Sequence, residues 1–205
     1  MPNHVYTYLH APKKVIDFIL VKDDKGSLCV DFNKVIPMPV HQPDLTKPNP
    51  FYAEGGLGTE EEQKFGRDNT WYWWSINNWG TKWNAYSTIV EGEEDVYFET
   101  AWSPASPVYL KLSEIFPDAV IKVSYQDEGG GFKCIEIYKG GVLMQDIDLT
   151  WQFSMDRTCP KCGEEYCYLN DNADVEFGYY TCCECDTTFK QGLDGNKIII
   201  EGDIT

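Results

Sequence analysis

Two pairs of cysteines near the C-terminus restrict what this chain can fold into more than any other feature. Cys159 and Cys162 form one C-x2-C pair, Cys182 and Cys185 form another, and nineteen residues separate the pairs. A C-x2-C pair lets one tight turn direct two thiolates at the same point, and two such pairs at this spacing are typical of a four-cysteine zinc site. We therefore predict that these four side chains bind a zinc ion.

The residues within and around the two pairs have the features of a zinc ribbon. Pro160 fixes φ in the first turn, and Gly163 permits the left-handed conformation that often closes such a turn. Residues 176–180 and 187–190 have the composition of short strands on either side of the second pair. Four protein ligands leave no position for water or substrate, so we predict a structural zinc that holds together about 40 residues, too few to build a core alone.

Two details of the metal site stay open. A rubredoxin-like iron centre uses similar cysteine turns, although no other redox feature accompanies this one. Cys183 could replace a neighbouring ligand, but only Cys182 with Cys185 reproduces the C-x2-C spacing. We expect Cys183 and Cys167 to be free thiols.

The net charge argues against most anionic partners. The chain of 205 residues has 17 basic and 33 acidic side chains, for a formal charge of −16, and the excess lies in residues 51–205. Such a surface repels a nucleic-acid duplex or an anionic membrane. No apolar run approaches the length of a membrane span, and no signal sequence opens the chain. We expect a cytoplasmic protein whose partner is a protein with a basic surface, with nucleic acid less favoured.

Residues 1–150 combine strand patterns and helix patterns, which predicts an α+β domain with helices on one face of an antiparallel sheet. Residues 151–205 then form the ribbon. An irregular stretch is expected at residues 41–58. The strand patterns cover residues 5–10, 28–36, 83–90, 95–102, 119–126, 132–139 and 142–150, and the helix patterns cover residues 13–20, 68–79 and 107–116, with a short helix that opens at Thr59.

The candidate partner-binding residues are aromatic or acidic. Residues 71–85 hold five of the seven tryptophans, and burial against the sheet explains most of them, while an exposed remainder such as Trp73 would suit a partner. Two acidic runs would complement a basic protein, although they could equally serve only solubility. These runs consist of Glu60, Glu61 and Glu62 and of Glu93, Glu94 and Asp95.

Several long motifs of the first 150 residues resemble the YubB family of plasmid and phage accessory proteins. They lie at residues 31–39, 78–84 and 98–104. The resemblance implies a ferredoxin-like α+β fold, a topology without an iron–sulfur cluster, and an origin in a bacterial mobile element. It implies no activity, because no catalytic residues are established for the family.

The sequence contains none of the common catalytic signatures. A phosphate-binding loop, a zinc-protease motif and a nucleophile elbow are all missing. We therefore predict a non-enzymatic, acidic, zinc-binding accessory protein that binds and modulates a host protein, such as a nucleic-acid-handling or defence enzyme. One alternative is a protein that binds nucleic acid through its ribbon and sheet, and a second is an enzyme without a recognisable motif.

Overall fold

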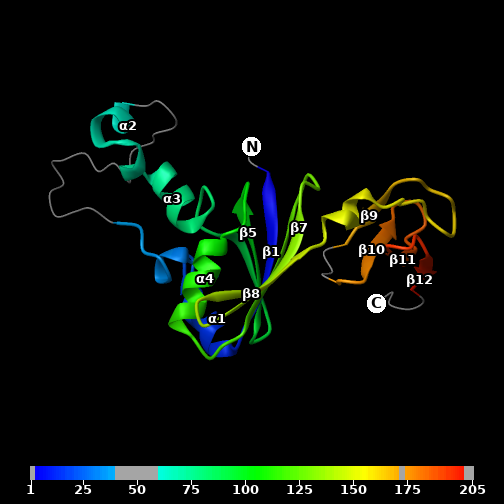
Figure 1. The fold of residues 1–205 in the computed structure, drawn as a ribbon, viewed down its shortest axis with the longest axis horizontal. Helices are drawn as coiled ribbons and strands as arrows, with labels where there is room; N and C mark the ends of the chain where they lie inside the picture. Colours follow the sequence, from blue (N-terminus) through cyan, green and yellow to red (C-terminus); the bar gives the residue numbers. More distant parts are fainter. Residues whose placement is uncertain (1–2, 40–59, 171–173, 201–205) are drawn as a thin grey trace.

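The computed structural model describes residues 3–39, 60–170 and 174–200 (Figure 1). Its larger part is a six-stranded antiparallel sheet with the strand order β4-β5-β1-β6-β7-β8. A separate four-stranded antiparallel sheet contains the C-terminal cysteines. The expected α+β class is confirmed. Within the described ranges, no helix is long and apolar enough to cross a membrane.

The first four strands of the large sheet follow the ferredoxin-like topology. Two β-α-β units interlock, so that β5 lies between β1 and β4, and β1 lies between β5 and β6. Strands β7 and β8 extend the sheet beyond β6. The bounds are β1 (His4–His10), α1 (Lys13–Ile19), β4 (Tyr86–Glu91), β5 (Asp95–Ala101), α4 (Ser106–Ile115), β6 (Ile121–Asp127), β7 (Lys133–Lys139) and β8 (Val142–Asp148).

A long insertion separates α1 from β4 and carries the tryptophan-rich segment. Its described residues form a hairpin and two α-helices, and Figure 1 shows α2 at the far end of this insertion from α1. The indole of Trp79 is 3% exposed, and its Nε1 donates a hydrogen bond to the carbonyl oxygen of Ile36 at 2.8 Å. The elements are β2 (Leu20–Lys22), β3 (Leu28–Val30), α2 (Glu60–Phe65) and α3 (Trp71–Trp79).

The core lies between the large sheet and the helices. Alternate residues of β1 are buried against α1 and α4, including Val5 and Leu9. Val15 and Ile16 of α1 and Leu112 of α4 belong to the same buried cluster. The residues between them on β1 therefore lie on the opposite face, which we call the open face.

Several expected boundaries were wrong for local reasons. The strand expected over residues 28–36 ends at Val30, because the Asp31 carboxylate accepts a hydrogen bond from the Asn33 amide and starts a 3-10 turn. The helix expected after a cap at Asp68 or Asn69 begins at Trp71, with Thr70 as its N-cap, and ends, as expected, at Trp79 before Gly80, whose φ is +81°. Thr59 and residues 41–58 lie outside the described ranges.

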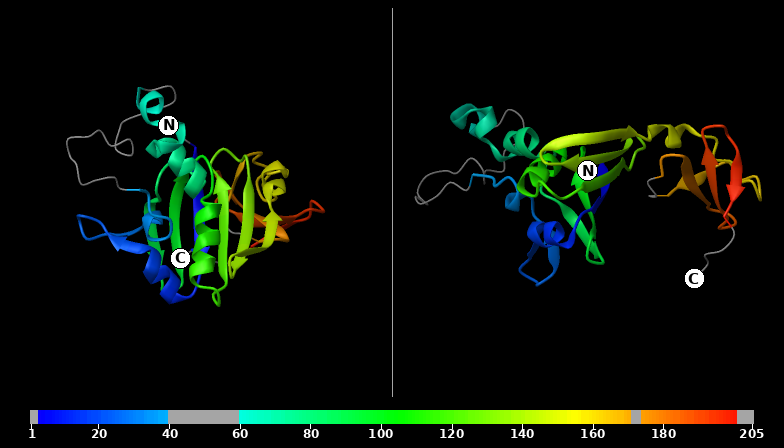
Figure 2. Two further views of the ribbon diagram at one scale, coloured as in Figure 1. Left: turned by 60° about the vertical axis from the view of Figure 1, so that its left-hand side comes forward. Right: turned by 60° about the horizontal axis from the view of Figure 1, so that its bottom comes forward.

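The small sheet has the order β12-β11-β10-β9 and is joined to the large sheet through a 3-10 turn at Thr150–Ser154. The Tyr180 hydroxyl donates to the carbonyl oxygen of Gln152 at 2.7 Å, and Lys133 Nζ donates to the carbonyl oxygen of Asn170 at 3.1 Å. Figures 1 and 2 show this sheet beside the large one. Its strands are β9 (Cys167–Leu169), β10 (Phe177–Cys182), β11 (Thr188–Gly192) and β12 (Lys197–Ile199).

Candidate metal centre

The four cysteines of the two C-x2-C pairs lie together. The Sγ atoms of Cys159 and Cys185 are 3.7 Å apart, those of Cys162 and Cys182 are 3.5 Å apart, and all four lie within 4.8 Å of one another. Four thiolates at about 2.3 Å from a tetrahedral zinc ion would be about 3.8 Å apart. The cluster could therefore hold a metal ion.

The first pair stands in a tight turn closed by the backbone, which we call the first knuckle. The Gly163 amide donates to the carbonyl oxygen of Cys159 at 3.0 Å, and the Cys159 amide donates to the carbonyl oxygen of Glu164 at 2.7 Å. Gly163 has φ +81°, a conformation that glycine adopts at little cost. The Lys161 amide also approaches the Cys159 sulfur at 3.4 Å, so the turn directs an N–H group at the ligand.

The second pair stands in an equivalent turn, the second knuckle. The Asp186 amide donates to the carbonyl oxygen of Cys182 at 3.1 Å, and the Cys182 amide donates to the carbonyl oxygen of Thr187 at 3.0 Å. Asp186 takes the left-handed position, with φ +52°. Asp is one of the few residue types other than glycine that are enriched there.

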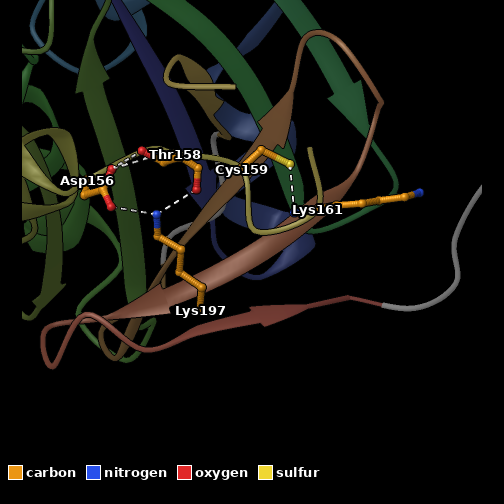
Figure 3. Close-up of polar contacts among 5 residues, drawn as sticks. All are labelled: Asp156, Thr158, Cys159, Lys161 and Lys197. Carbon is orange, nitrogen blue, oxygen red and sulfur yellow. Dashed lines mark hydrogen bonds and ion pairs between the residues drawn. The ribbon is translucent and has the colours of Figure 1, made fainter. Parts of the chain in front are cut away.

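A polar clamp fixes the chain where it enters the first knuckle (Figure 3). The Asp156 carboxylate accepts hydrogen bonds from the Thr158 hydroxyl at 2.6 Å and the Thr158 amide at 2.9 Å. Lys197 of β12 donates to Asp156 Oδ2 at 2.9 Å. The hydrogen bonds from Thr158, followed by the one from Lys197, lower the pKa of Asp156.

The surroundings of the sulfurs favour some thiolates and oppose others. Hydrogen bonds from the Thr187 hydroxyl and amide lower the pKa of Cys185 to about 6. Burial opposes ionisation of Cys159, but the Cys162 and Lys161 amides outweigh it and lower its pKa. An amide favours the thiolate of Cys162, yet its contacts with the other sulfurs raise its pKa to about 12. A bound dication relieves this conflict, because it stabilises all four thiolates together.

Two further cysteines border the cluster without belonging to it. Cys167 is paired with Cys182 across β9 and β10 and is buried, and burial is the main cause that raises its pKa to about 12. Cys183 is exposed, and its thiol donates to the carbonyl oxygen of Tyr166 at 3.4 Å. This contact places Tyr166 beside the second knuckle.

Exposed acidic and aromatic residues follow the first knuckle in the chain and lie within the second. Tyr166 and Tyr168 are 77% and 69% exposed, and Glu165 and Glu184 are exposed beside them. We call the set Glu165, Tyr166, Tyr168, Cys183 and Glu184 the knuckle surface. It combines negative charge with rings that a cation could contact.

Trp73 and the first acidic run lie together in the insertion. The Trp73 indole Nε1 donates to the Glu62 carboxylate at 3.0 Å, and the Arg67 guanidinium lies 3.3 Å from the centre of the Trp73 ring. Glu60 is exposed at the start of α2, and the side chain of Glu61 lies outside the described part of the chain. Trp73 is therefore half-buried between two charged neighbours.

The second acidic run forms the turn between β4 and β5, beside α1. Glu93 lies 3.8 Å from Lys13, and the carbonyl oxygen of Glu94 accepts a hydrogen bond from the Ala11 amide at 2.9 Å. Asp95 lies 2.8 Å from His10. Because Figure 1 places α1 and α2 far apart, the structure does not bring the two acidic runs together.

Sequence reasoning did not single out the most exposed tryptophans. Trp83 and Trp102 are 37% and 46% exposed, and they flank Lys82, whose Nζ lies 4.7 Å and 4.6 Å from the two ring centres. The sequence contains one signal for the exposure of Trp83. This residue comes after Gly80, the glycine that ends α3, so it does not belong to the helix that packs on the core. Nothing in the sequence places Trp102 beside Trp83.

A family model of known proteins agrees with the ferredoxin-like topology. Residues 78–166, from the end of α3 to the first knuckle, match the family model of the ferredoxin-like domain in Api92-like protein. The solved structure of protein Api92 from Yersinia pseudotuberculosis is 19% identical, with a TM-score of 0.35, and the match covers 38% of this chain and 30% of that chain. No curated protein matches the sequence. The expected ferredoxin-like domain is confirmed by this match. The matching family model is that of Api92-like protein, so the YubB family is not confirmed.

Proposed function

We propose that the four-cysteine centre binds one zinc ion and that this zinc is structural. The sulfur separations of 3.5 Å and 3.7 Å carry this proposal, because they suit a tetrahedral shell of thiolates about 2.3 Å from zinc. Among the described residues, the buried cluster of the small sheet contains three cysteines and only two large side chains, Tyr180 and Phe189. So small a core needs the metal to stay folded.

Metal analysis of the purified chain by plasma emission spectrometry tests this assignment. We expect one zinc ion per chain and no visible absorption band. Stoichiometric iron with a strong thiolate-to-iron absorption would contradict zinc and would favour the rubredoxin-like alternative.

We further propose that the protein is a non-enzymatic accessory protein of a phage, plasmid or other mobile element, and that it binds a basic protein in the cytoplasm of a bacterial host. The resemblance of its motifs to the YubB family supports the mobile-element origin. The charge of −16 supports a basic partner, because complementary charge speeds association.

The knuckle surface is the part of the molecule that we propose contacts this partner. Its two exposed tyrosines, Tyr166 and Tyr168, offer rings to arginine or lysine side chains, and Glu165 and Glu184 offer carboxylates. Tyrosine and arginine are also enriched among the residues that dominate binding energy at interfaces. A nucleic-acid-handling or defence enzyme with a basic surface would suit this chemistry.

Affinity purification from a bacterial lysate, repeated with charge-reversal variants, tests the proposed interface. Glu165→Lys combined with Glu184→Lys reverses the charge of the knuckle surface, and Asp24→Lys combined with Asp118→Lys is the matched control at two exposed positions outside it. We expect the wild type and the control to retain the same basic protein and the knuckle variant to lose it, with the affinities then measured on the purified partner. Equal retention by both variants, or an acidic partner, would contradict the proposal.

A further inference from the structure

The open face of the large sheet carries aromatic side chains on its central strands. Alternate residues of β1 are buried against the helices, so Tyr6 and Tyr8 lie on the open face. The antiparallel register places Tyr8 opposite Tyr97 of β5, and their rings are 5.0 Å apart. Two adjacent half-buried tyrosines on a sheet offer a surface on which a planar group can stack.

The aromatic side chains continue to the end of the sheet. The Tyr86 ring lies 5.7 Å from the His4 ring and 6.3 Å from the Trp83 ring. Beyond them, Lys82 stands between the exposed rings of Trp83 and Trp102. We call this set the aromatic band, and its members are Tyr8, Tyr97, Tyr86, Trp83, Trp102 and Lys82.

Trp102 is held in a conformation that a large side chain rarely adopts. Its φ is +71°, which costs energy for any residue other than glycine. Its amide donates to the carbonyl oxygen of Asn3 at 2.9 Å, and the Thr100 hydroxyl donates to the carbonyl oxygen of Ser103 at 2.8 Å. These contacts hold the backbone so that the indole stays exposed beside Lys82.

The open face carries charges of both signs. Glu99 and Asp95 of β5 each contact a histidine, at 3.1 Å and 2.8 Å, and Glu91 of β4 lies opposite Asp95 on the same face. Lys122 is exposed on the same face of β6, opposite His10. Lys82 and Lys122 are the cations beside the aromatic band, and Asp95 shares a groove with Lys122.

A groove on the open face combines a ring with these charges. It has a volume of about 370 Å³ and is lined by Tyr8, His10, Asp95, Lys122 and Ser124. This volume lies in the range of about 300–1,000 Å³ that is typical of small-ligand sites. A nucleotide would fit its chemistry, with the base on the Tyr8 ring and the phosphate near Lys122.

We infer that the open face binds single-stranded nucleic acid along the aromatic band. Unpaired bases can stack on tyrosine and tryptophan rings, whereas a duplex hides the faces of its bases. Lys82 and Lys122 supply phosphate contacts at opposite ends of the band. The inference goes beyond the proposed function, because it depends on neither the zinc ion nor the basic protein partner.

Fluorescence anisotropy with a labelled oligothymidylate of about 12 nucleotides tests the inference on the full-length, zinc-loaded chain. We expect saturable binding at about 50 mM salt that weakens as salt is added, and weaker binding of a duplex of the same length. Tyr8→Ala should weaken binding about tenfold, and Tyr8→Phe, which keeps the ring, should restore it. Lys82→Ala should reduce the slope of log affinity against log salt by about one.

The controls separate the open face from the ribbon and from misfolding. Tyr168→Ala removes an exposed tyrosine of the knuckle surface and should leave the affinity unchanged. Trp102→Ala is a second band variant at an exposed position, with folding of each variant checked by circular dichroism. An unchanged anisotropy for the wild type at about 50 mM salt would overturn the inference. So would wild-type affinity in both Tyr8→Ala and Trp102→Ala, or an equal loss in Tyr168→Ala.

Discussion

Lys197 Nζ donates a hydrogen bond to the carbonyl oxygen of Thr158 at 2.7 Å, so the edge strand β12 is tied to the residue that precedes Cys159. The same ammonium contacts Asp156, and the Lys197 side chain is only 15% exposed. The two residues are far apart in the sequence, and their contact closes the small sheet around the first knuckle. The position of Cys159 therefore depends on the last described strand.

Lys197→Met should loosen the first knuckle. The variant keeps the stem of the side chain but loses the hydrogen bonds to Thr158 and Asp156. Zinc release to a chelator, followed by absorbance, should be several-fold faster than in the wild type. Lys161→Met is the matched control, because Lys161 is exposed and points away from the clamp (Figure 3). Equal release rates in both variants would show that the clamp does not hold the knuckle.

Cys182→Ser and Cys183→Ser should differ sharply, although the two residues are adjacent. Cys182 is buried in the four-cysteine cluster, so its loss should reduce the zinc content from one ion per chain to nearly none. Cys183 is exposed outside the cluster, and its loss should leave the zinc content unchanged. Metal analysis of the two purified variants tests this prediction. Zinc loss in Cys183→Ser but not in Cys182→Ser would contradict it and would make Cys183 the ligand in place of Cys182.

Gly80→Ala should destabilise the large sheet with its helices, which we call the large domain. A Cβ at this position would lie 2.8 Å from Pro107 Cδ, and the φ of +81° already disfavours a side chain. We expect a loss of at least about 1–2 kcal/mol, measured by urea unfolding followed by circular dichroism. Gly26→Ala is the control, because Gly26 has φ +82° but nothing within 4 Å of a Cβ. The difference between the two variants isolates the contact with Pro107, and equal losses would mean that it has no effect.

The clustering of the four cysteines could be predicted from the sequence because the geometry of each pair is local. A C-x2-C turn is closed by backbone hydrogen bonds within a few residues. These bonds fix the positions of Cys159 and Cys162 relative to each other without any contact from the rest of the fold. Alternation of buried and exposed residues likewise predicts strands such as β1 without knowledge of the rest of the fold.

The exposed tryptophans could not be predicted, because their surroundings depend on contacts between distant segments. Trp83 and Trp102 both lie beside Lys82 because the Thr81 hydroxyl bonds to the backbone of Ala101 at 2.9 Å and 3.1 Å. Trp79 is buried because its indole reaches Ile36 from another part of the insertion. Helix periodicity distinguishes faces, but it does not say which face of an inserted helix meets the core.

The stability of the large domain should fall at alkaline pH in a way that depends on Tyr86. Burial, followed by the charge of Glu99, raises the pKa of Tyr86 to about 12, and its hydroxyl donates to the carbonyl oxygen of Thr100 at 3.0 Å. Because the folded pKa lies above the unfolded value of about 10, this contribution is complete below pH 10 and is lost as the pH rises through 12. Urea unfolding between pH 9 and about 11 should therefore show a decline that is shallower in Tyr86→Phe. Parallel curves for the wild type and the variant would mean that Tyr86 ionises as readily in the folded chain as in the unfolded one.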